Sequence, residues 1–90
     1  MSVLLITYNE TGINPSVDLV QKFMNRYKHV QISESSYVIE TDEQTRTVFN
    51  KIIPYLSSNA HLFIVTIMQP FSVQGIDHVK GWLRKHLPEE

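Results

Sequence analysis

The chain has 90 residues and no cysteine, and its eight Lys and Arg against nine Asp and Glu give a formal net charge of −1. This length corresponds to a single domain over residues 1–90, and a chain without cysteine has neither disulfide bonds nor thiolate metal sites. The near-neutral charge excludes a global basic excess of the kind that attracts nucleic acid, although local basic patches remain compatible with it. No segment approaches the about 20 apolar residues of a spanning helix, so we expect a cytoplasmic protein with no membrane partner.

The first predicted elements are a strand and a helix. A continuous apolar run over 3–8 predicts a central strand, and the polar turn 9–12 ends it. Asn14 suits a helix N-cap and Pro15 suits the first helical position. Apolar residues at helical spacing then predict a helix from about 15 to 27.

A hairpin and a second helix follow. Two short strands around the polar turn 33–36 make residues 29–41 a predicted hairpin. Thr41 followed three residues later by Gln44 matches a capping box and predicts the start of a helix there. Pro54 should end or kink this helix near its last turn. Its apolar stripe consists of Val48, Phe49, Ile52, Ile53 and Leu56.

The last predicted elements are an apolar strand over 62–68 and a helix from about 76 to 87, which Pro88 stops. The order of elements is therefore β-α-β-β-α-β followed by a helix. With right-handed crossovers, this order predicts an α+β, ferredoxin-like βαββαβ fold. It consists of an antiparallel four-stranded sheet with two helices on one face, and here it carries an extra C-terminal helix.

The predicted fold places the last strand at an edge of the sheet, although the strand is apolar at nearly every position. An exposed apolar edge invites pairing with another chain. Two explanations stay open: the C-terminal helix covers this strand, or the strand pairs with or packs against a second copy. The second explanation predicts a homodimer. Its predicted interface residues are Phe63, Val65, Ile67 and Trp82.

Several short strings resemble a known family. They are the opening strand 4–9, the turn and strand 34–42, the Pro-Tyr-Leu string 54–56, the apolar strand 62–65 and the terminal helix 81–87. They are similar to the CRISPR-associated small adaptation nuclease family and its relatives, and most similar to the SinR-type proteins and the virulence-associated protein D toxins. The resemblance covers roughly residues 3–87 and implies a ferredoxin-like fold.

In the nucleases of that family, an aspartate follows the tyrosine at the end of the first strand. Two copies of it face each other across the dimer axis and are thought to hold a divalent metal for phosphodiester cleavage. The matching position here is Asn9, which is uncharged, whereas Mg²⁺ prefers anionic oxygen ligands. Glu10 is the second candidate, but neighbouring residues on an extended chain point to opposite sides.

The resemblance and the residue at position 9 together lead to three hypotheses. The first is a non-catalytic dimeric interaction module that binds nucleic acid or a protein partner and needs no cofactor. The second is a Mg²⁺- or Mn²⁺-dependent endonuclease or toxin-like ribonuclease with an altered catalytic site at Asn9 and Glu10. The third is a regulator carried by a phage or mobile element.

Two basic clusters are candidate nucleic-acid contacts, and a dimer would double both of them. Lys22 and Arg26 lie near the end of the first predicted helix, and the terminal helix carries a second cluster. The alternative is a solvated helix face whose C-terminal charges suit the helix dipole. The second cluster consists of Lys80, Arg84 and Lys85.

Histidines and aromatic residues favour structural roles. No pair of histidines has a tight ligand spacing, so no zinc site is expected, although His29 and His61 both begin strands and could lie close together. Tyrosines on strands and helices usually pack rather than stack on bases. The tyrosines concerned are Tyr8, Tyr37 and Tyr55.

Overall fold

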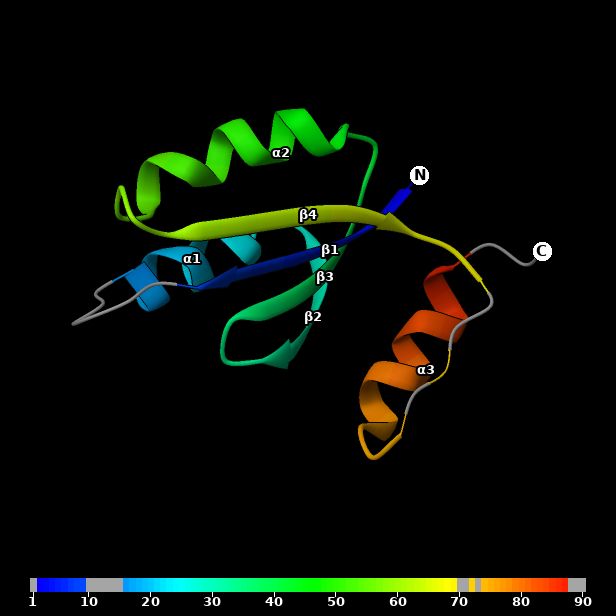
Figure 1. Ribbon diagram of the computed structural model, residues 1–90. Helices are drawn as coiled ribbons and strands as arrows, with labels where there is room; N and C mark the ends of the chain where they lie inside the picture. Colours follow the sequence, from blue (N-terminus) through cyan, green and yellow to red (C-terminus); the bar gives the residue numbers. More distant parts are fainter. Residues whose placement is uncertain (1, 10–15, 70–71, 73, 88–90) are drawn as a thin grey trace.

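Four strands form one antiparallel sheet in the computed structural model, which describes residues 2–9, 16–69, 72 and 74–87 (Figure 1). The predicted β-α-β-β-α-β-α order is confirmed. In chain order the elements are β1 (Ser2–Asn9), α1 (Ser16–Met24), β2 (Lys28–Ser33), β3 (Ser36–Thr41), α2 (Thr45–Ile52), the short 3-10 helix η1 (Ile53–Tyr55), β4 (His61–Ile67) and α3 (Asp77–His86).

β1 lies at the centre of the sheet, whose strand order is β2-β3-β1-β4. It pairs antiparallel with β3 on one side and with β4 on the other, so that Ile6 stands opposite both Tyr37 and Ile64. The central position of the first apolar run is therefore confirmed, and β2 and β4 form the two edges. This architecture is compatible with the predicted ferredoxin-like arrangement.

The first core lies between the sheet and the helices α1 and α2. Side chains alternate along a strand, so Leu4, Ile6 and Tyr8 share one face of β1. All three are buried in this core. The apolar stripes of both helices contribute side chains to the first core. α1 and α2 therefore lie on the same face of the sheet, as the sequence predicts. The helical residues buried there are Val20, Phe23, Met24, Val48 and Ile52.

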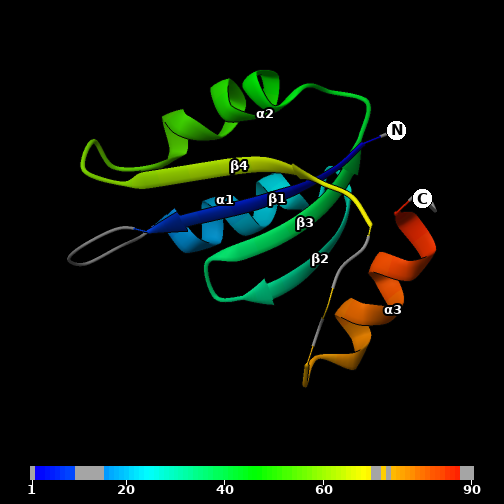
Figure 2. The ribbon, with the colours of Figure 1, turned by 45° about the vertical axis from the view of Figure 1, so that its right-hand side comes forward.

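The second core lies on the opposite face, under α3. Val3 and Val38 point away from the first core and pack against the terminal helix. Figure 2 shows α3 on its own, on the side of the sheet away from α1 and α2. Because both faces near β1 are covered, this strand is apolar at nearly every position. The α3 residues buried in the second core are Val79 and Leu83, and Leu87 joins them just after the helix.

The start of α2 differs from the capping-box prediction. Thr41 is the last residue of β3, and its Oγ1 accepts a hydrogen bond from the backbone N–H of Glu43 at 3.0 Å. The helix begins only at Thr45, and the residue before it, Gln44, makes no side-chain cap. The threonine thus stabilises the turn between the strand and the helix instead of capping the helix, because a Ser/Thr-turn competes for the same hydroxyl.

The end of α2 agrees with the prediction. The helix stops at Ile52, and Pro54 lies within the tighter turn of η1. Proline lacks the N–H that would continue the α-helical pattern, and this accounts for the change. Among the described residues, no helix is long and apolar enough to cross a membrane.

Candidate functional site

The end of β1 carries Asn9, which the sequence resemblance predicts to correspond to a metal-binding aspartate. Asn9 is exposed and stands opposite His61 on β4, while Tyr8 beside it is buried in the first core. Glu10, the second candidate ligand, lies outside the described residues. Within 2–9, 16–69, 72 and 74–87, no three His, Asp or Glu side chains gather as ligands of a metal ion would.

β4 is an edge strand whose outer side pairs with no other described strand. Its residues Leu62 and Ile64 are half-buried and pack against the first core, whereas Ile67 packs against the second. Phe63 remains 61% exposed, and Val65 is half-buried. The strand therefore presents apolar side chains as well as unpaired backbone groups at its edge.

The two edges of the sheet differ in their protection against pairing. β2 begins with Lys28, and its pairing with β3 is interrupted by a register shift between Gln31 and Ser33. Charged residues and bulges of this kind discourage further strands from adding to an edge. β4 carries no charged residue or proline between His61 and Ile67. Edge pairing is thus open at β4 and discouraged at β2.

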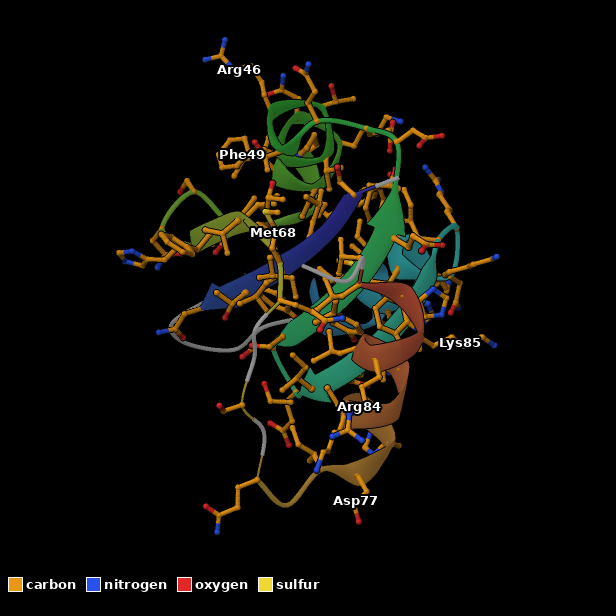
Figure 3. The ribbon with its side chains drawn as sticks, turned by 90° about the vertical axis from the view of Figure 1, so that its right-hand side faces the viewer. Arg46, Phe49, Met68, Asp77, Arg84 and Lys85 are labelled. Atoms are coloured by element: carbon orange, nitrogen blue, oxygen red, sulfur yellow. The ribbon has the colours of Figure 1, made fainter. Side chains whose placement is uncertain are left out.

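α2 and η1 each add one exposed apolar side chain beside the β4 edge. Phe49 and Ile53 are each 37% exposed, and Figure 3 shows Phe49 and Arg46 projecting from the helix. Two surface hollows meet at Phe49. One of about 360 Å³ extends along α2 and β4 past Arg46, and one of about 450 Å³ extends past Ile53 to Asn9. We call Phe49, Ile53 and Phe63 the edge patch.

The sequence predicts Phe49 and Ile53 on the buried stripe of the second helix, and there the structure differs. Only Val48 and Ile52 of this helix are buried. The predicted stripe comprises two neighbouring rows of residues, which is an ordinary width for a helix that covers a sheet. The local pattern therefore does not reveal that one of the two rows is exposed.

Trp82, predicted as an interface residue or as part of the core, is half-buried against the second core. Its ring stacks on that of His86 with centroids 4.1 Å apart. The Nδ1 atom of His86 in turn lies 3.1 Å from Oε2 of Glu40 on β3. Trp82 and Ile67 therefore share the second core, while Phe63 lies outside it.

The two basic clusters lie on elements that cover opposite faces of the sheet. Lys22 lies in the last turn of α1 and is exposed. Arg26 follows that helix, with its guanidinium 5.4 Å from the centre of the Phe23 ring. The second cluster is on α3, where Arg84 and Lys85 are exposed, as Figure 3 shows, and Lys80 is half-buried. One chain does not combine the two clusters into a single surface.

The histidines His29 and His61 do not come together. His29 is the second residue of β2 and His61 is the first residue of β4, and these strands are the opposite edges of the sheet. The tyrosines pack as predicted: Tyr8 and Tyr37 are buried, and Tyr55 packs against the first core.

A polar network links the end of α1 to α2. The hydroxyl of Tyr27 donates a hydrogen bond to Oε1 of Glu43 at 2.5 Å, and Lys51 donates to the other carboxylate oxygen. Burial and the hydrogen bond to Glu43 raise the pKa of Tyr27, so its hydroxyl stays protonated. The hydrogen bond from Lys51, followed by that from Tyr27, lowers the pKa of Glu43.

No family model matches the chain, and no curated protein matches it. The case for a function therefore depends on the geometry of the sheet edges and of the two faces.

Proposed function

We propose that this chain is a ferredoxin-like domain, related to the small adaptation nucleases, that acts as a non-catalytic dimeric interaction module. The order of elements and the strand order β2-β3-β1-β4 support the assignment of the fold. The proposed dimer forms where β4 of one copy pairs antiparallel with β4 of the other. Its surface then binds nucleic acid or a protein partner.

The observation that carries the proposal is the unprotected edge of β4 beside the edge patch. Pairing would satisfy the outer backbone groups of β4 and bury Phe63, which is 61% exposed. It would also bring α2 of each copy together over the joined sheet, so that Phe49 and Ile53 contact their counterparts. Removing apolar surface from water drives association, by about 25 cal/mol per Å².

The geometry of such a dimer favours a non-catalytic role. Asn9 stands opposite His61 at the beginning of β4. Antiparallel pairing centred on Ile64 would separate the His61 residues of the two copies by six residues of strand, or roughly 20 Å. The two Asn9 side chains would then be too far apart to share one metal ion, in addition to lacking its charge.

The test is sedimentation equilibrium of the full chain over a wide range of concentration. The wild-type chain is expected to dimerise, and Phe63→Glu is expected to be monomeric, because a carboxylate on each copy would repel at the joined edge. Leu19→Glu is the matched control, since Leu19 is an exposed apolar residue of α1 and belongs neither to β4 nor to the edge patch. A wild-type chain that stays monomeric at high concentration would refute the dimer.

A further inference from the structure

A polar cleft of about 390 Å³ lies between α1 and the edge strand β2. One wall is a stripe of α1 and the turn after it, whose members recur at the i, i+3, i+4, i+7 spacing of a single helix face. The opposite wall is His29 and Gln31 of β2, and Tyr37 of the neighbouring strand β3 also lines the cleft. The residues of the helical stripe are Asp18, Gln21, Lys22 and Asn25.

Two polar residues of this cleft, His29 and Gln31, lie on the face of the sheet that is otherwise packed with apolar side chains. His29 and Gln31 stand opposite Ile39 and Tyr37, both of which are buried in the first core. They therefore point to the face of the sheet that α1 covers. Alternate residues of β2 pack against the second core instead. A local break in the apolar pattern of an otherwise consistent fold is typical of a functional position.

Tyr37 adds a second, independent observation. Its side chain is only 1% exposed, yet its hydroxyl has no hydrogen-bond partner among the described residues. A buried donor without a partner is costly, so native proteins rarely leave one unsatisfied. Burial also raises the pKa of Tyr37, which keeps the proton on the hydroxyl. The wall of the cleft thus holds a protonated donor for which the described residues supply no acceptor.

The hydrogen bonds that His29 and Gln31 already make determine which of their atoms remain available to a ligand. The Nδ1 atom of His29 donates to the carbonyl of Tyr27 at 3.0 Å, which leaves Nε2 as the ring nitrogen available to a ligand. Gln31 uses its Nε2 to donate to the carbonyl of Ser33 at 2.9 Å, which leaves Oε1 as an acceptor. Donors and acceptors are therefore both present within one small volume.

We propose that this cleft is a binding site for a nucleoside monophosphate. Carboxamides form paired hydrogen bonds with the edges of a base, and the cleft has three of them, on Gln21, Asn25 and Gln31. The carboxylate of Asp18 would accept from the ribose hydroxyls, and the ammonium group of Lys22 would bind the phosphate. The volume agrees with ligand pockets of roughly 300–1,000 Å³.

This site is separate from the proposed dimer. The cleft lies at β2 and the edge patch lies at β4, which are the opposite edges of the sheet. Occupation of the cleft therefore does not require dimerisation, and either proposal can fail without the other.

Isothermal titration of the full chain with AMP, GMP, CMP and UMP tests the proposal, with Tyr37→Phe as the main variant. We expect at least one nucleotide to bind, and Tyr37→Phe to weaken it about tenfold while leaving the ligand-free chain equally stable or more stable. Tyr27→Phe is the matched control. It removes a hydroxyl that already has a partner in Glu43, so it should lower stability and leave nucleotide affinity unchanged.

Lys22→Gln tests how the ligand is oriented. It should remove the preference for the monophosphate over the matching nucleoside, whereas Lys85→Gln on α3 should not. The proposal is overturned if no nucleotide binds, if free phosphate or a zwitterionic amino acid competes equally well, or if a crystal grown with the nucleotide shows only water at the Tyr37 hydroxyl.

Discussion

Ile6 is a central residue of the first core. It is fully buried on the central strand, between Tyr37 on β3 and Ile64 on β4, and it belongs to the core under α1 and α2. The residues around a side chain in this position are close-packed and can move only a little. A truncation there therefore leaves a cavity.

We expect Ile6→Ala to lower the free energy of unfolding by about 2–5 kcal/mol, the range for truncated buried aliphatic side chains. Leu19→Ala is the control, because Leu19 is 43% exposed on α1. It should change stability by no more than about 0.5 kcal/mol. Urea denaturation of both variants measures the difference, and equal losses would contradict the packing described for β1.

Glu43 predicts a specific dependence of stability on pH. Its pKa is lowered in the folded chain by hydrogen bonds from Lys51 and Tyr27. Its contribution is therefore fully present above the pKa of the unfolded state, near 4.5, and is lost as the pH falls through the lower pKa of the folded state. Since Lys51 is about half exposed, the contribution should stay below about 1 kcal/mol.

The measurement is urea unfolding of the wild-type chain and Glu43→Gln at a series of pH values. The wild-type chain should be the more stable at pH 7, and the difference should shrink as the pH is lowered below about 4. Glu34→Gln, which changes an exposed carboxylate in the β2–β3 turn, should show a smaller difference at every pH. If the difference in the free energy of unfolding between the wild-type chain and Glu43→Gln grew as the pH was lowered, the assigned direction of the pKa shift would be wrong.

At the scale of elements, α3 forms a core of its own with the face of the sheet opposite α1 and α2. Leu83 is buried against Val3 and Val38, while Arg84 beside it is exposed. The two cores are separated by the sheet itself, so loss of one should leave much of the other in place.

We expect Leu83→Asp to release α3 from the sheet because it buries an unpaired charge. Fluorescence of a dye that binds apolar surface should rise, and hydrogen exchange should accelerate in α3 while β1 remains protected. Arg84→Asp is the control with the same new side chain at an exposed position, and it should change neither signal. Complete unfolding of Leu83→Asp would show that the two cores are not separable.

The order of elements was predictable because the spacing of apolar residues in each segment indicates which of its side chains are buried, and therefore whether the segment is a helix or a strand. The continuous apolar run over 3–8 also predicted the central position of β1, which the strand order confirms. The exposure of Phe49 and Ile53 was not predictable from the local pattern, since it depends on whether another strand lies beyond β4. The same limit applies to the cleft: His29, Gln31 and Tyr37 become neighbours only through the pairing of β2 with β3 and the position of α1.

Thr41 shows a further limit of sequence reasoning. The sequence from Thr41 to Gln44 has the spacing of a capping box, but the hydroxyl accepts from the N–H of Glu43, and the helix starts later. Two local hydrogen-bonding patterns compete for one side chain, and the surrounding β3 strand selects between them.

At the scale of the whole molecule, the positions of the two sheet edges decide how copies of the chain can combine. β4 offers an unprotected edge, and Asn9 lies next to its beginning. The proposed dimer therefore keeps the two Asn9 residues apart, whatever side chain occupies this position.

We accordingly expect Asn9→Asp to create no Mg²⁺- or Mn²⁺-dependent cleavage of labelled RNA or DNA. Restoring the charge does not bring the second carboxylate within reach of the same ion. Gel assays with both metals, beside the wild-type chain, measure the outcome. Metal-dependent cleavage by the variant would show that the two strand ends do meet, and would favour the nuclease hypothesis over the interaction module.

The central position of β1 also has a consequence for how the chain acquires its structure during synthesis. β1 is synthesised before the other strands of the sheet, and its second partner, β4, ends only at Ile67. An apolar segment must therefore wait, unpaired on one side, until β4 has been made. Contacts between such distant segments form slowly, because a long loop must close before they are made. Of the four strands in the sheet, the one translated first is therefore among the last to gain all its partners, and during that interval the nascent chain is exposed to aggregation.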